Sequence, residues 1–105
     1  MNEIRRVDRA ADEIARIRGV VSRHALPEFV AGFDVELGEF DDEPAMWIIF
    51  HLTGERPAAW EDRRARAETM RQTIHALTME LYETGEGRYP YFRLTRTDQD
   101  APSAS

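Results

Sequence analysis

The chain has 105 residues with 14 basic and 20 acidic side chains, a net charge of −6 and no cysteine. Its length fits one domain, and its 42% hydrophobic content is enough for a buried core. The lack of cysteine excludes disulfides, thiolate metal sites and cysteine nucleophiles. No apolar run reaches the roughly 18 residues of a membrane span, and the charged start does not resemble a signal peptide, so we expect a cytoplasmic protein. Every lysine-or-arginine position is arginine, which indicates either a GC-rich genome or selection for arginine. We expect a bacterial protein.

The first predicted element is an amphipathic helix over residues 3–23. Asn2 suits its N-cap, because a side-chain oxygen there can accept a hydrogen bond from a free amide of the opening turn. Pro27 disfavours helical geometry at the residue before it, so the helix should end by His24 or Ala25. Apolar residues recur every three or four positions, which predicts one buried stripe. This stripe consists of Ile4, Val7, Ala11, Ile14, Ile17 and Val21.

Two strands are predicted next, and they pair most simply as an antiparallel hairpin. Residues 33–38 alternate between apolar and polar side chains, with the period of two that a half-buried strand requires. Residues 45–52 are apolar on both faces and rich in β-forming side chains, so this strand should be central or two-sided. The turn between the strands contains Asp41, Asp42, Glu43 and Pro44.

A long helix is predicted over residues 57–83. Pro57 suits its first turn, where the missing amide costs no hydrogen bond. Gly85 and Gly87 end it, because glycine adopts the left-handed conformation without a steric penalty. Its predicted apolar stripe consists of Trp60, Ala67, Met70, Ile74, Leu77 and Leu81.

Residues 89–95 form the last predicted strand, and Pro90 favours an edge position because it lacks a backbone donor. Residues 98–105 show no apolar periodicity and are predicted to be a disordered tail, which leaves residues 1–97 as a single domain. The fold class is therefore α+β, with element order α-β-β-α-β and two helices packed on one face of a three-stranded sheet.

This element order resembles the type II KH arrangement and related ribosome-assembly-factor folds. A KH domain clamps RNA with a GxxG turn, whereas the nearest stretch here, residues 54–57, reads Gly-Glu-Arg-Pro. The resemblance carries over no site residue. It implies an alternative function, a KH-like RNA-binding or ribosome-associated module.

Alternation along the strands predicts an aromatic surface on the sheet face away from the helices. If Met46, Ile48 and Phe50 face the helices, every second side chain of that strand faces the other way. The same holds for the last strand if Phe92 and Leu94 face inward. Trp, Tyr and Arg are the usual anchors of interfaces, so we expect a homodimer or a complex with a partner protein, unless the first helix or loops cover this face. The predicted interface residues are Trp47, Ile49, His51, Tyr89, Tyr91 and Arg93.

Acidic side chains crowd the first strand and the hairpin. They can steer association with a basic partner or mimic a nucleic-acid backbone, as an antitoxin-like protein or acidic accessory factor would. Alternatively, they solvate an outer strand face and keep its edge from pairing with other chains. They also disfavour nucleic acid, which needs clustered positive charge. We assign an acidic rim of the interface to Asp41, Asp42 and Glu43.

The long helix carries the local basic residues, but acids interleave with them, which predicts a solvated face with ion pairs rather than a nucleic-acid surface. These arginines are Arg63, Arg64, Arg66 and Arg71.

Catalysis has little support in the sequence. His24, His51 and His75 include no pair with the helical i, i+4 spacing of a metal site. His51 beside Glu36 and Arg93 would form the minimum of an acid–base cluster. No nucleophile motif or phosphate-binding loop is present. We therefore expect a non-catalytic protein with no cofactor, no metal, no membrane association and no small-molecule ligand.

Overall fold

The computed structural model describes residues 2–85 and 87–96, with side-chain surroundings described from residue 9 onward. In chain order the elements are α1 (Asn2–Arg23), β1 (Val30–Phe40), β2 (Glu43–Leu52), α2 (Trp60–Glu83) and β3 (Tyr89–Arg96). This order confirms the predicted α+β class. The tail predicted at residues 98–105 lies outside the described residues.

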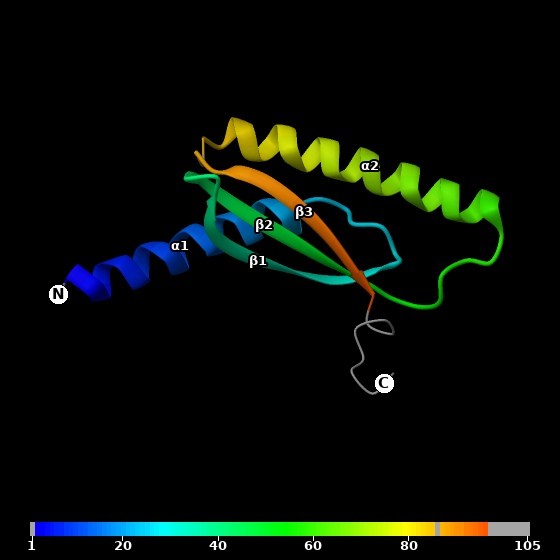
Figure 1. Ribbon diagram of the computed structural model, residues 1–105, viewed down its shortest axis with the longest axis horizontal. Coiled ribbons are helices and arrows are strands. Elements are labelled where there is room, and N and C mark those ends of the chain that lie inside the picture. Colours follow the sequence, from blue (N-terminus) through cyan, green and yellow to red (C-terminus); the bar gives the residue numbers. More distant parts are fainter. Residues whose placement is uncertain (1, 86, 97–105) are drawn as a thin grey trace.

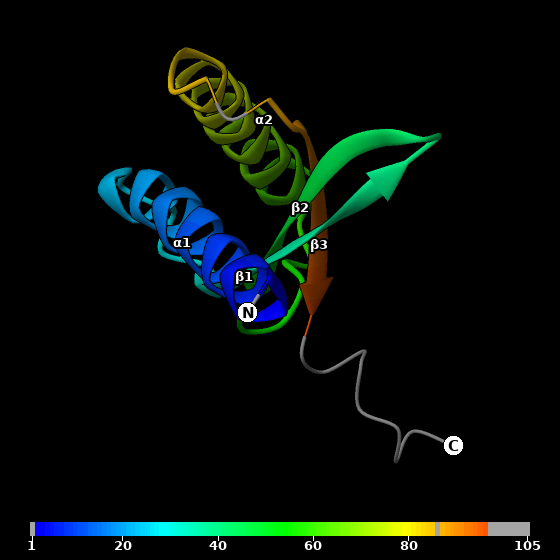
Figure 2. The ribbon, with the colours of Figure 1, turned by 90° about the vertical axis from the view of Figure 1, so that its left-hand side faces the viewer.

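The strands form a three-stranded mixed sheet in the order β1-β2-β3. β1 and β2 are an antiparallel hairpin, whereas β3 returns through α2 to lie parallel to β2. Pro90 therefore lies in an edge strand, as its missing amide predicts. Both helices lie on the same side of the sheet (Figures 1 and 2), which leaves the other sheet face without a helix in the described chain.

The hairpin turns through Asp41 and Asp42, whose φ angles are 56° and 64°. Positive φ at both central residues matches the two-residue turn whose twist suits a β-hairpin, and aspartate tolerates this conformation. The hairpin tip projects away from both helices (Figure 2). The acidic rim is consequently carried out into solvent at one end of the sheet.

The core lies between the helices and the inner sheet face. β2 contributes its alternate residues to this core, as the predicted period requires. Burying these apolar surfaces is the main favourable contribution to folding. The largest fully buried side chains are Phe50, Ile17, Met46, Ile48, Leu77 and Val21.

The first turns of α2 are not part of this core, contrary to the predicted stripe. Trp60 is 71% exposed and Ala67 is also exposed, because the start of the helix extends beyond the end of the sheet (Figure 1). Pro57 lies in the preceding loop rather than in the first turn. Ala11 of α1 is exposed as well, so burial on that helix is centred on Ile17 and its neighbours.

Candidate functional site: the open sheet face

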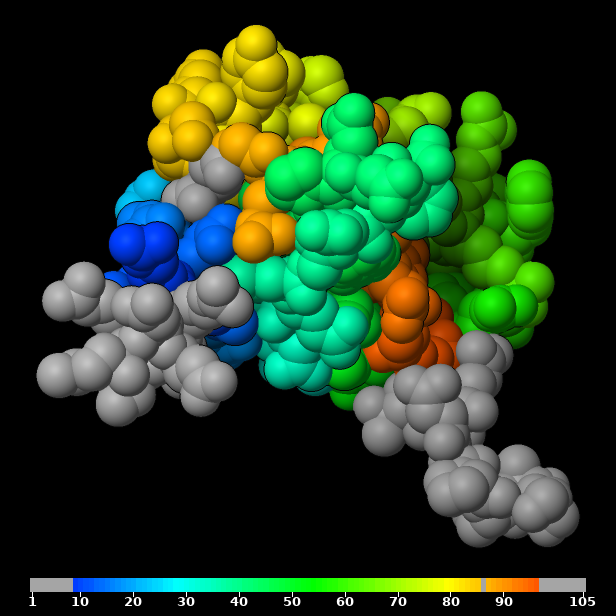
Figure 3. All heavy atoms as spheres, turned by 60° about the vertical axis from the view of Figure 1, so that its left-hand side comes forward, coloured from blue at the N-terminus to red at the C-terminus, as the bar shows by residue number. Residues whose placement is uncertain are grey.

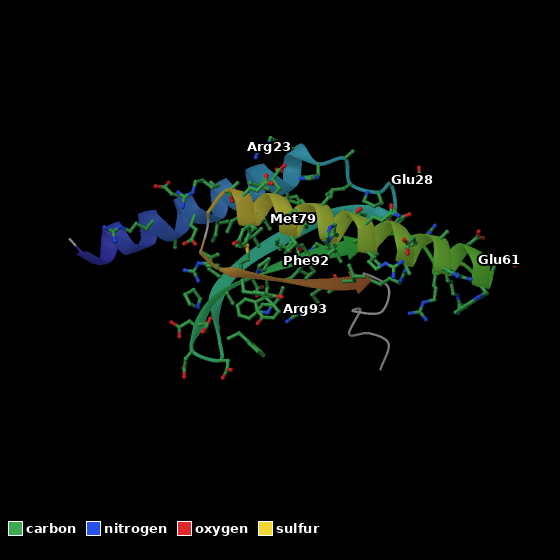
Figure 4. The ribbon with its side chains drawn as sticks, turned by 90° about the horizontal axis from the view of Figure 1, so that it is seen from above. Arg23, Glu28, Glu61, Met79, Phe92 and Arg93 are labelled. Carbon is green, nitrogen blue, oxygen red and sulfur yellow. The ribbon has the colours of Figure 1, made fainter. Side chains whose placement is uncertain are left out.

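The side chains on the helix-free side of the sheet form a continuous surface, which we call the open sheet face. Cross-strand register places Trp47 between Glu36 and Tyr91. One step further along the strands, Ile49 lies between Asp34 and Arg93. Figure 4 shows Phe92 on the helix side of β3 and Arg93 on the opposite side. The predicted interface residues thus share one face, because each occupies the outward position of its strand. Contrary to its predicted role as an interface residue, Ile49 is buried on this face, with 7% exposure.

An aromatic cluster occupies one end of the open sheet face. The Trp47 ring stacks on Tyr91 with centroids 5.8 Å apart. Phe40 and Tyr89 approach Tyr91 from two sides at 5.1 and 5.0 Å. Phe40 is 56% and Tyr89 is 65% exposed. Figure 3 shows the hairpin and β3 at the surface together, so this cluster combines large apolar area with access to solvent.

Phe40 was missed as a member of this cluster. It lies at the last position of β1, beyond the alternating stretch from which that strand was predicted. Phe40 lies an even number of residues after Asp34 and Glu36, so its side chain lies on the same face of the sheet. Extending the alternation to the end of the strand would have identified it. The ring contact with Tyr91, across β2, depends on how the sheet twists.

His51 joins all three strands through hydrogen bonds. Its Nε2 lies 2.6 Å from Asp34 Oδ2, and its Nδ1 lies 2.9 Å from Thr95 Oγ1. The sequence suggested Glu36 and Arg93 as neighbours of His51. In the structure its hydrogen-bond partners are Asp34 and Thr95 instead. The regular register of the hairpin sets Gly32 opposite His51 and Asp34 opposite Ile49, so Asp34 reaches His51 diagonally across the two strands.

A carboxylate, an imidazole and a hydroxyl in sequence are the groups of an acid–base relay. Here the trio lies open to water, because the Asp34 side chain is 63% and the His51 side chain 37% exposed. Water at this position screens charge and competes for each hydrogen bond. The arrangement therefore favours a role in ordering the open sheet face over chemistry in a closed site.

The acidic rim lies at the hairpin tip, with Asp41, Asp42 and Glu43 all exposed. Within residues 2–85 and 87–96, no group of three or more acidic or histidine side chains is placed to hold a metal ion. Across those same ranges, no helix combines the length and the apolar character of a membrane span.

The arginines of α2 differ from the predicted ion-paired face. Arg71 does pair with Glu68, one turn before it. Arg63 instead donates to the Pro57 carbonyl, and the Arg66 guanidinium lies over the Phe29 ring. The interleaved acids therefore neutralise only part of this basic surface.

The stretch at residues 54–57 lies in the loop between β2 and α2, where Gly54 has a φ of 76°. Its glycine therefore serves a turn, and its proline cannot offer an amide to a phosphate. The likeness to the KH arrangement remains one of element order. No protein-family model matches the chain, and no curated protein or solved structure is significantly similar to it.

Proposed function

We propose that the protein is a non-catalytic interaction domain that forms a homodimer through the open sheet face. The observation that carries this proposal is the aromatic cluster of Phe40, Trp47, Tyr89 and Tyr91, in which Phe40 and Tyr89 are exposed and Trp47 and Tyr91 are half-buried. Sheets with one apolar face commonly bury it by packing against another sheet. Aromatic anchors surrounded by charged side chains are typical of binding surfaces.

Charge complementarity favours a second copy of this chain as the occupant. Glu36 on edge strand β1 and Arg93 on edge strand β3 each lack an ionic partner in the described part of the chain. In a twofold interface every contact occurs twice with the roles exchanged. A twofold axis parallel to β2 sets β1 of one copy against β3 of the other. Each Arg93 then faces Asp34 of the other copy and lies one step along the strand from its Glu36.

The alternative twofold axis, perpendicular to the strands, would set β1 against its own copy. Asp34 and Glu36 would then face the same two acids, and like charges at an interface are costly. We therefore favour the first arrangement, with Trp47 and Tyr91 at its centre. The acidic rim would lie at the periphery, where it favours solubility and opposes further edge pairing.

Light scattering on the purified protein tests the dimer, whose expected mass is twice the 12.2 kDa of one chain. Glu36→Arg and Arg93→Glu, made separately, should each weaken dimerisation by roughly tenfold or more, because each sets like charges against one another. The double variant should recover part of the lost affinity, since the charges at positions 36 and 93 are again opposite in sign. Arg64→Glu on α2 is the control and should leave the mass unchanged.

Three outcomes would overturn the proposal. The wild-type protein could remain a monomer over the accessible concentration range. The two single variants could dimerise as well as the wild type. The larger species could collapse to a monomer on nuclease treatment, which would point to the KH-like RNA-binding alternative instead.

A further inference from the structure

A groove lies where the first turns of α2 extend past the carboxyl ends of β2 and β3. Its volume is about 580 Å³, which falls within the roughly 300–1,000 Å³ of small-molecule sites. β2 and β3 are the parallel pair of the sheet. In open sheets, ligands commonly bind outside the carboxyl ends of parallel strands. The groove also lies at the opposite end of β2 from the acidic rim.

The groove carries a strong positive charge within an acidic protein. No acidic residue in the described chain lines it, although the whole chain has a net charge of −6. Arg71 is paired with Glu68. The other four guanidinium groups have no acidic partner among the described residues. The lining arginines are Arg56, Arg63, Arg66, Arg71 and Arg96.

Two of these arginines are held in place by neutral acceptors. Arg63 Nε donates to the Pro57 carbonyl at 2.6 Å, and Arg96 Nη1 donates to the Gly54 carbonyl at 2.8 Å. A carbonyl orients a guanidinium without cancelling its charge, and each guanidinium has five N–H donors. Most donors of Arg63 and Arg96 therefore remain available to an anion, while the loop before α2 limits their motion.

The rest of the lining is mostly apolar. Phe29 is its one aromatic side chain among the described residues, and the Arg66 guanidinium lies 5.0 Å from the centre of that ring. Leu94 faces this groove and is 46% exposed, although its position on β3 points toward the helix side. The aliphatic part of the lining is Leu52, Pro57, Met70, Ile74 and Leu94.

This combination distinguishes between classes of ligand. Inorganic phosphate would satisfy the arginines and leave the aliphatic lining in water. A single-stranded nucleic acid needs free aromatic faces for its bases, and one face of Phe29 is already covered by Arg66. An occupant with an anionic head and an aliphatic body would satisfy both parts of the groove.

We infer that the groove binds an amphiphilic anion from solution, with a carboxylate or phosphate head among the arginines and a single aliphatic chain over Met70, Ile74 and Leu94. This site lies on the helix side of the sheet and does not depend on the proposed homodimer. Variants that break the dimer through Glu36 or Arg93 should therefore bind this ligand unchanged.

Isothermal titration calorimetry with octanoate, decanoate and decyl phosphate, below their micelle-forming concentrations, tests the inference. The dissociation constant should fall by up to about fourfold per added methylene. Comparison of decanoate with decyl phosphate distinguishes the two head groups. Decyltrimethylammonium, which has the same chain and the opposite charge, should not bind, and inorganic phosphate alone should bind weakly.

Matched variants locate the site. Arg56→Gln should weaken decanoate binding by roughly tenfold, as expected for the loss of a hydrogen bond to a charged group. Arg56 is exposed and has no polar partner in the described structure, so the fold should persist, as circular dichroism would show. Arg64→Gln, on α2 but outside the groove, is the control and should bind as the wild type does. Leu94→Asn should reduce the dependence on chain length.

Several results would overturn the inference. Octanoate and decanoate could bind equally, decyltrimethylammonium could bind as well as decanoate, or Arg56→Gln and Arg64→Gln could behave alike. Sedimentation with anionic phosphatidylglycerol vesicles, or binding of a single-stranded RNA, without any binding of free decanoate would assign the arginines to a membrane or to nucleic acid instead.

Discussion

Gly38 allows the Trp47 ring to lie across β1 in the open sheet face. A Cβ atom built at Gly38 would be 2.9 Å from Trp47 Cζ3, which is closer than carbon atoms pack. The ring has little freedom to move aside, because it is stacked on Tyr91. A single missing methyl group thus helps to set the shape of the aromatic cluster.

We expect Gly38→Ala to destabilise the protein by about 1–3 kcal/mol, the usual cost of overpacking a well-packed site. Urea unfolding followed by fluorescence measures this free energy. Gly32→Ala is the matched control on the same strand, since nothing lies within 4 Å of a Cβ there. Equal stability of the two variants would show that Trp47 adjusts freely and is not fixed by Gly38.

At the scale of elements, α2 begins without a side-chain cap. Its N-cap residue Ala59 has φ −76° and ψ 135°, the extended geometry in which a serine side chain could accept a hydrogen bond from the first turn. Ala59 cannot do so, and the acids Glu61 and Asp62 provide only the favourable charge at that helix end. The overhanging start of α2 is therefore stabilised less than its buried end.

Ala59→Ser should stabilise the protein by about 1 kcal/mol and raise Tm by about 4–8 °C, because it supplies the missing acceptor. Thermal unfolding followed by circular dichroism measures the shift. Ala58→Ser adds the same hydroxyl one residue outside the cap and should leave Tm nearly unchanged. If Ala58→Ser had the same effect, the gain would not come from capping.

At the scale of the whole molecule, Arg88, which precedes β3, forms hydrogen bonds to α1, β1 and β2. Its Nε donates to Glu13 of α1 at 2.6 Å, and its Nη1 donates to the carbonyls of Gly38 and Ala45 at 2.9 and 3.2 Å. The Arg88 and Glu13 side chains are only 24% and 18% exposed. These contacts join the helix layer to the hairpin near its acidic end.

Arg88→Ala should cost about 2–3 kcal/mol of unfolding free energy, because it leaves a partly buried carboxylate and two carbonyls without their donor. Chemical denaturation measures this loss. Arg64→Ala, at an exposed position on α2, should change stability by at most about 0.5 kcal/mol. A similar small effect of Arg88→Ala would mean that water replaces the lost donor.

The whole molecule also separates its charges along the sheet. The acidic rim lies at the start of β2, whereas the arginine-lined groove lies at the other end of that strand. An anion approaching the protein is therefore repelled at one end and attracted at the other. The net charge of −6 is a sum over the whole chain and does not indicate this separation.

The local pattern of the chain determined the elements and their faces. A period of two specified which side chains of β2 face the helices, and Pro90 specified an edge strand, because both effects act on the backbone itself. Periodicity also predicted that the outward aromatics and Arg93 share one surface. Periodicity did not indicate which turns of α2 contact the sheet. Trp60 was therefore wrongly assigned to the core.

The tertiary structure alone decided which distant residues meet. His51 binds Asp34 because the turn at Asp41 and Asp42 fixes a register in which Asp34 lies diagonally across from His51, whereas the sequence located this turn only to residues 41–44. The groove gathers arginines from the loop at Arg56, from α2 and from Arg96 at the end of β3. Periodicity describes one element at a time, whereas a site formed by several elements depends on how they pack.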